Sequence, residues 1–289
     1  MSEITLAGPN ILLMGPSGTG KTFALGTLTD WAQANGKEMF VLFTESGTET
    51  LLGYWTDVGL PPFNRTEPLP IPPCLHWHQQ TTRPLPLTSL IDAATKVGMM
   101  SYDAVTKMQD MNRSGDNNAL LKIYKSCSDF PDDRTGKTFG SIDSWTSDRI
   151  FVIDSLSELA NACMKHVIGN KPTAAPPDYG VAQNSLMNFL RLCTQATQCT
   201  FVMTAHVDKQ TDEISGMTKT MVKSIGKALA GDIPPLFSDV IYTVRDAAEF
   251  FWDTAAYGVD CKTRSLGYRS KIRPDFAQIM NVWKGRGGK

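Results

Sequence analysis

Residues 11–33 read ILLMGPSGTGKTFALGTLTDWAQ, and this stretch decides the fold. Its first four residues are apolar and predict a short buried strand. A glycine-rich turn follows, and the spacing of apolar residues after position 21 predicts a helix. A strand, a glycine-rich loop and a helix in this order form the setting that a phosphate-binding loop requires.

The loop fits the pattern G-x-x-x-x-G-K-[ST]. Glycines let successive backbone N–H groups turn inward, and the start of the helix adds the positive end of its dipole, so an anion is favoured there. We therefore expect ATP with Mg²⁺, with the Lys21 ammonium at the β and γ phosphates and the Thr22 hydroxyl on the metal. The expected nucleotide-binding residues are Gly15, Pro16, Ser17, Gly18, Thr19, Gly20, Lys21 and Thr22.

Composition places few limits on the partner but several on the class of protein. The chain has 289 residues, 42% of them hydrophobic, which is ample for the core of one large domain. A formal net charge of −1 means that nucleic acid could be held only by a local basic surface. The six cysteines lack C-x-x-C spacing, and no signal peptide or membrane-spanning run is present, which favours the reducing cytoplasm of a cell and no membrane partner.

Alternating β-rich runs and helical patterns predict an α/β fold with a mostly parallel sheet flanked by helices, as one domain over residues 1–289. We expect core strands at residues 11–14, 39–43, 150–153, 201–204 and 240–244. Residues 56–148 show little strand pattern: residues 61–86 hold eight of the seventeen prolines, and two or three amphipathic helices are expected between Leu87 and Ser126. We interpret 56–148 as an insertion or subdomain on the nucleotide core, which either covers the site or contacts a partner, or is a surface elaboration without chemistry.

Two carboxylates follow apolar strands. Asp154 ends the run FVID and is expected beside the phosphate loop, holding Mg²⁺ together with Thr22, because ligands gather at the carboxyl ends of parallel strands. Glu45 ends the run FVLFTE, where it can orient water or take its proton. Many P-loop ATPases carry their glutamate directly after the metal-binding aspartate, but here that residue is Ser155, and Glu45 follows a separate strand.

This placement resembles the RecA-like recombinase ATPases. GPSGTGKT is similar to that family's phosphate loop, FVLFTES to its strand with the catalytic glutamate, and FVIDSLSEL to its metal strand. TFVMTAH resembles the strand whose last polar residue senses the γ-phosphate, here His206, although a histidine can also be held by the core alone. YGVDCKTRS resembles a late strand whose two cations, here Lys262 and Arg264, reach the nucleotide of a neighbouring subunit.

The segments TAH and GKALAGDIPPLFSDVIYTVR resemble most the small phage-encoded RecA-like ATPases of single-strand annealing recombination. The resemblance covers about two thirds of the chain and excludes 56–148. It implies ATP hydrolysis on single-stranded DNA, nucleotide sites shared in a homo-oligomer, and the cytoplasm of a bacterial host. Whether subunits form rings, filaments or monomers stays open.

DNA contacts are expected from the loops that follow the metal strand and the sensor strand. The first holds Lys165, His166 and Lys171; the second holds Lys209, Lys219, Lys223 and Lys227. Lysines spaced along a loop neutralise phosphates without reading bases. The second loop also holds Asp208, Asp212 and Glu213 and no aromatic residue, so a solvated surface is the alternative.

Two further function classes stay open, as does one metal site. A packaging motor or helicase loader would carry its glutamate beside Asp154, and a nucleotide-dependent scaffold would have vestigial hydrolysis. Cys74, His76 and His78 in CLHWH have the residue types of a metal site, but no second ligand cluster follows at a usable spacing.

Overall fold

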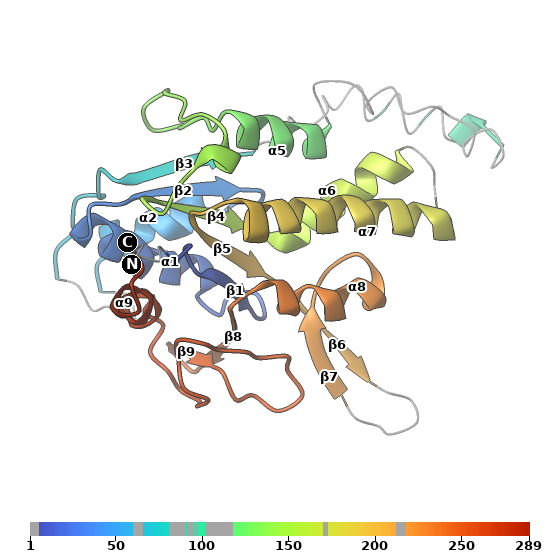
Figure 1. The fold of residues 1–289 in the computed structure, drawn as a ribbon. Coiled ribbons are helices and arrows are strands. Elements are labelled where there is room, and N and C mark those ends of the chain that lie inside the picture. The colour runs from blue at the N-terminus through green and yellow to red at the C-terminus, as the bar shows by residue number, and fades with distance from the viewer. Residues whose placement is uncertain are drawn as a thin grey trace, which may run out of the picture.

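The computed structural model describes residues 6–59, 66–80, 91, 95, 98–101, 118–169, 173–211 and 218–289. Within them the chain forms one seven-stranded sheet and a separate two-stranded hairpin (Figure 1). The strand order in the sheet is β3-β2-β4-β5-β1-β8-β9, and all neighbours run parallel except β8 and β9. The predicted α/β fold with a mostly parallel sheet and flanking helices is confirmed.

The strands occupy short, mostly apolar segments of the chain. The five expected core strands are all present, each extended by one or more residues, as β1, β2, β4, β5 and β8. Four of the five bury almost every residue, as strands covered on both faces do. The strands are β1 Asn10–Met14, β2 Glu38–Phe43, β3 Leu75–Gln79, β4 Arg149–Asp154, β5 Thr200–Ala205, β6 Val207–Thr211, β7 Thr218–Val222, β8 Asp239–Asp246 and β9 Glu249–Asp253.

Helices cover both faces of the sheet. One face packs on α1, α2 and α9 and the other on α5, α6, α7 and α8, so side chains of each central strand alternate between two hydrophobic cores. The α-helices are α1 Lys21–Ala34, α2 Thr48–Thr56, α5 Ala119–Ser128, α6 Leu156–Ile168, α7 Pro176–Arg191, α8 Gly226–Asp232 and α9 Ala277–Gly285. The short turns are 3₁₀ segments η1 Ile142–Ser144 and η3 Pro234–Leu236 and the π-helical η2 Leu192–Ala196. Among these helices none has the length and apolar character to cross a membrane.

The segment 56–148 contributes more to the sheet than its sequence indicates. Residues 75–79 form β3, which pairs in parallel with β2 and extends the main sheet at one edge. The expectation of little strand structure is therefore wrong at this position. Of the helices expected between 87 and 126, α5 is present at Ala119–Ser128, capped by the Asn118 side chain, which accepts a bond from the Leu121 N–H. Most of residues 81–117 lie outside the described residues, and the insertion stays a prediction.

Parallel strands bring four predicted segments to the same end of the sheet. The phosphate loop follows the end of β1, Glu45 follows β2, Asp154 ends β4, and His206 follows β5. Since Phe43 pairs with Asp154, and Met14 with Ala205, these ends are also level along the sheet. The fold therefore places the candidate site at the carboxyl ends of the central strands.

Candidate nucleotide-binding site

The phosphate loop has a backbone that only glycine allows at several positions. Gly18 and Gly20 have φ angles of 73° and 79°, in the left-handed region that other residues avoid. At Gly15 a Cβ atom would lie 2.1 Å from the Thr243 hydroxyl oxygen, so a side chain there is excluded. The Lys21 ammonium folds over the loop and donates to the carbonyl oxygens of Gly15 and Pro16, at 2.9 and 2.7 Å.

Lys21 is a buried cation facing two carboxylates. Burial lowers its pKa, and Asp154 and Glu45 act in the opposite direction. Its present partners are main-chain carbonyls of the loop itself. A phosphate oxygen would be a stronger partner for the ammonium, because it carries a formal negative charge and a carbonyl oxygen carries only a partial one.

Thr22 and Asp154 are in contact across the loop and strand β4. The Thr22 hydroxyl donates to Asp154 Oδ2 at 2.6 Å, and the Thr204 hydroxyl donates to Asp154 Oδ1. Burial is the largest effect and raises the pKa of Asp154, although these two hydrogen bonds and the Lys21 charge act in the opposite direction. A hydroxyl and a carboxylate held together beside a phosphate loop are hard oxygen donors, and they fit Mg²⁺, which keeps several waters and phosphate oxygens as its other ligands.

Glu45 and His206 face each other across the same pocket. His206 Nε2 lies 3.4 Å from Glu45 Oε1, and both side chains are about one third exposed, at 29% and 33%. Gln79 of β3 donates to the Glu45 carbonyl at 2.9 Å, and the His206 N–H donates to the Ser157 hydroxyl at 3.1 Å. The two residues thus sit at strand ends that are fixed by neighbouring elements.

A cavity of about 340 Å³ collects these side chains. The structure brings together most of the loop, the predicted metal pair, the predicted base and the predicted sensor. It also adds three residues that the sequence did not indicate: Phe23, Ser46 and Thr50. Phe23 follows the Lys-Thr pair directly, which was the available signal. The lining residues are Ser17, Gly18, Thr19, Gly20, Lys21, Thr22, Phe23, Glu45, Ser46, Thr50, Asp154 and His206.

Lys262 and Arg264 lie elsewhere. Lys262 forms an isolated bridge with Val240, near the start of β8, and its ammonium donates to the Pro235 carbonyl at 3.3 Å. The Arg264 N–H donates to the buried Asp239 carboxylate at 2.9 Å, and its side chain is exposed. β8 runs parallel to β1, and it begins at the end of the sheet opposite the phosphate loop. The chain therefore does not bring these two cations to its own nucleotide pocket. The segment 257–265 is also a loop with two isolated bridges, at Val259 and Lys262, where a strand was expected.

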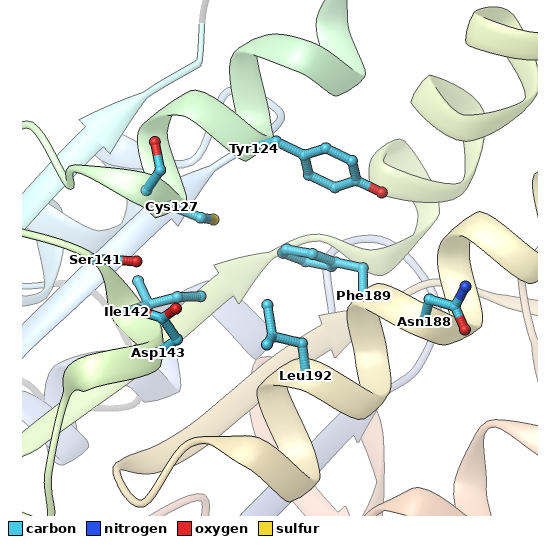
Figure 2. A pocket seen from close by; sticks show the side chains of 9 residues that line it. Tyr124, Cys127, Ser141, Ile142, Asp143, Asn188, Phe189 and Leu192 are labelled. Carbon is cyan, nitrogen blue, oxygen red and sulfur yellow. The ribbon is translucent and has the colours of Figure 1, made fainter.

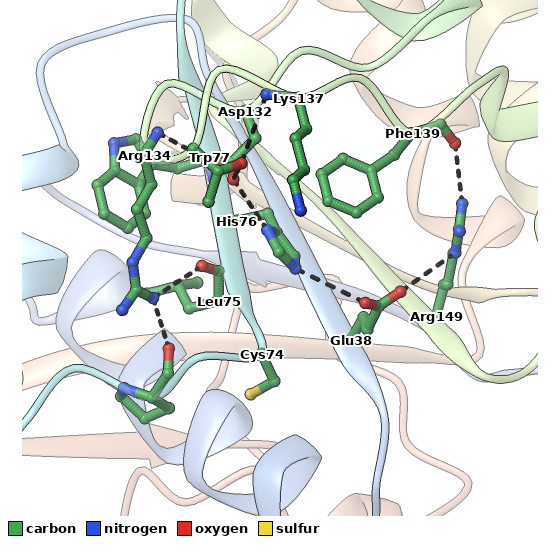
Figure 3. A network of polar contacts seen from close by, with 12 residues as sticks. Glu38, Cys74, Leu75, His76, Trp77, Asp132, Arg134, Lys137, Phe139 and Arg149 are labelled. Atoms are coloured by element: carbon green, nitrogen blue, oxygen red, sulfur yellow. Dashed lines mark hydrogen bonds and ion pairs between the residues drawn. The ribbon is translucent and has the colours of Figure 1, made fainter.

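His76 of CLHWH belongs to a network of polar contacts that includes Glu38, Asp132 and Arg149 (Figure 3). His76 on β3 contacts Asp132 at 3.0 Å and Glu38 at 3.8 Å, and its ring stacks on Phe40 with centroids 4.8 Å apart. Burial raises the pKa of the Cys74 thiol to about 11. Within the described residues, no three His, Cys, Asp or Glu side chains gather as a metal ion would need.

The lysines expected at DNA are partly described. Lys209 and Lys219 lie on the hairpin of β6 and β7, where Lys219 pairs with Asp260 at 2.8 Å; Lys171 and the hairpin tip, 212–217, lie outside the described residues. Lys165 and His166 lie in the last turn of α6. A cavity of about 510 Å³ joins Lys209 and Lys227 to Tyr179 of α7, an aromatic residue that the sequence of the loop did not provide.

A further cavity, of about 420 Å³, lies between α5, η1 and the end of α7 (Figure 2). Tyr124, Ile142, Phe189 and Leu192 form most of its apolar wall. None of the predicted site residues belongs to its lining.

Similarity to known proteins is found among solved structures. No family model matches the chain, and no curated protein matches it. Among solved structures, a prototypical ATPase from the type III secretion system of pathogenic bacteria is similar with 14% identity and a TM-score of 0.37. The similarity covers 83% of this chain and 53% of that one, so the chain spans about half the length of that protein. An identity and a TM-score this low do not assign an activity.

Proposed function

We propose that this protein is an ATPase of RecA-like type that uses Mg²⁺ and acts on single-stranded DNA in recombination or annealing. The observation that carries the proposal is one 340 Å³ pocket in which Lys21, the Thr22–Asp154 pair and Glu45 face each other. The pocket contains a cation for phosphates, oxygen donors for a metal and a carboxylate for water. These are the parts that phosphoryl transfer to water requires.

Each side chain has a defined task in the proposed reaction. Lys21 leaves the carbonyls of its own loop and neutralises charge on the β and γ phosphates. Thr22 and Asp154 would hold Mg²⁺, which supplies charge neutralisation and orients the phosphates when bound. Glu45 orients a water molecule in line with the γ-phosphate and accepts its proton.

The position of Glu45 supports the recombinase-like type. β2 and β4 are neighbours in the sheet, and Glu45 lies two residues beyond Phe43, the partner of Asp154. Ser155, the residue after Asp154, is fully buried and cannot reach water. A motor or helicase loader would carry its glutamate at that position, so the one-strand displacement favours the first class.

The DNA part of the proposal is supported by the connection between His206 and the hairpin. His206 separates β5 from β6, and its carbonyl accepts a bond from the Lys223 N–H at 2.8 Å, just beyond β7. A shift of His206 toward a γ-phosphate would therefore move the end of the hairpin where β6 begins and β7 ends, and this hairpin carries lysines. Lysines so placed contact the backbone of a single strand without reading its sequence.

The test is the rate of ATP hydrolysis with and without single-stranded DNA, with sizing of the protein in both conditions. We expect Mg²⁺-dependent hydrolysis that DNA stimulates, abolished by Lys21→Ala. Lys37→Ala is the matched control, because Lys37 is a partly buried lysine whose ammonium donates to the Ser147 carbonyl and does not line the pocket. Absence of hydrolysis in the unaltered protein would refute the ATPase. Hydrolysis that saturating DNA leaves unchanged would refute the role on DNA.

A further inference from the structure

Phe23 is an unusual member of the nucleotide pocket. It follows Thr22 in the first turn of α1, and it is half-buried while Lys21 and Ala24 beside it are buried. Among the described residues that line this pocket, Phe23 provides the one phenyl ring. A partly exposed aromatic ring at the end of a polar phosphate loop therefore needs a reason.

Neighbouring aromatic residues hold the Phe23 ring in place. Tyr54 meets it edge-on, with centroids 5.2 Å apart at 61°, and Phe250 of β9 flanks it at 6.5 Å and 50°. Tyr54 is itself fixed, because its hydroxyl donates to Asp30 at 2.8 Å. Its ring also packs so closely on Gly26 that a Cβ there would lie 2.1 Å away. The ring of Phe23 is thus oriented before any ligand binds.

We propose that Phe23 is the platform on which the nucleobase of the bound nucleotide stacks. The proposal rests on the proposed nucleotide site and specifies which part of the ligand the site reads. With the phosphates in the loop that ends at Thr22, the sugar and base occupy the rest of the pocket, whose lining includes Phe23. Aromatic side chains stack on any base, and the larger purines gain most contact.

The rest of the pocket lining sets the preference among bases. Outside the phosphate loop, Ser46 and Thr50 line the pocket and offer hydroxyls, which both donate and accept hydrogen bonds. Such a group accepts the edge of adenine and of guanine. The site therefore selects purine over pyrimidine triphosphates by stacking and separates ATP from GTP only weakly.

The experiment compares ligands that share phosphates and differ in the base. Binding of ATP, GTP, CTP and inorganic tripolyphosphate is measured by calorimetry with Mg²⁺ present, for the unaltered protein and for Phe23→Leu, which keeps an apolar side chain. We expect Phe23→Leu to weaken ATP and GTP about 5- to 100-fold, the range that base stacking provides, and tripolyphosphate less than about 2-fold. Phe23→Tyr retains the ring and is expected to bind ATP as the unaltered protein does.

Phe251→Leu is the matched control, because Phe251 is the next residue to Phe250 on β9 but packs under Lys271, 5.6 Å from its ring. It is expected to change neither ATP nor tripolyphosphate affinity. Unchanged ATP affinity in Phe23→Leu would overturn the proposal. So would an equal loss of ATP and tripolyphosphate, which would mean that the ring supports only the phosphate loop. If the unaltered protein binds neither ligand, the proposed function itself has failed.

Discussion

Replacing Glu45 with glutamine separates catalysis from binding and folding. The substitution keeps the size of the side chain and removes its charge and its ability to accept a proton. Glu45 lines the pocket beside Lys21 and faces His206 at 3.4 Å, and among the described contacts its side chain forms no hydrogen bond with the phosphate loop. The structure therefore predicts a protein that folds, binds ATP and fails to cut it.

The magnitudes of the two effects differ enough to be distinguished. A general base contributes about 10²- to 10⁴-fold to a rate, which corresponds to about 3–5.5 kcal/mol in the barrier. The contact between Glu45 and His206 is about one third exposed on each side and is screened by water, so it contributes at most about 1 kcal/mol to stability. Loss of the pair is expected to shift the melting temperature by no more than a few degrees, roughly 2–4 °C.

The assay is single-turnover hydrolysis of ATP, with nucleotide binding and thermal unfolding measured on the same samples. Glu49→Gln is the matched control, because Glu49 is exposed on α2, four residues away, and does not line the pocket. We expect its hydrolysis to match that of the unaltered protein. If Glu45→Gln hydrolyses ATP within about threefold of the unaltered rate, Glu45 is not the base, and the assignment to recombinase-like ATPases loses its main support.

Three further predictions follow from other parts of the molecule. Burial alone would raise the pKa of Asp132, but hydrogen bonds from Thr135, His76 and two backbone N–H groups hold it below its usual range. The Asp132 carboxylate therefore stabilises the fold above about pH 3.9, and this stabilisation is lost as the pH falls through the lowered pKa of the folded state. In urea unfolding experiments, Asp132→Asn should lower the free energy of unfolding by about 1–3 kcal/mol at pH 7 and weaken its dependence on pH below pH 4. Mixing an Arg264→Ala variant with a Lys21→Ala variant should restore hydrolysis if sites are shared between subunits, and no recovery at any ratio would contradict sharing. Removing Lys209 or Lys227 should lower the slope of log affinity against log salt for single-stranded DNA by about 0.7 each, measured by fluorescence anisotropy, and an unchanged slope would place the DNA elsewhere.

The central strands could be predicted because burial on both faces leaves a clear mark on a sequence. FVID and TFVMT are continuous apolar runs, and in the structure nearly every residue of β4 and β5 is buried. The same runs identify their carboxyl ends, so Asp154 and His206 could be located before the fold was known. Parallel pairing then brings these ends together, because strands that run the same way end at the same edge.

The edge strand β3 and the cations of 262–264 could not be predicted in this way. LHWHQ alternates apolar and polar residues over too short a run, with prolines before it. Its position in the sheet is supported by Asp132 and Asp133, more than fifty residues away. These carboxylates contact the two histidines and accept hydrogen bonds from two backbone N–H groups of β3. The Lys262 segment is held by Asp239, which accepts bonds from the Arg264 and Ser265 N–H groups. A buried carboxylate that organises a distant loop has no local pattern in the sequence. Since the loop is fixed at the start of β8, its cations can reach a nucleotide only on another copy of the chain, so a role for Arg264 in hydrolysis requires assembly.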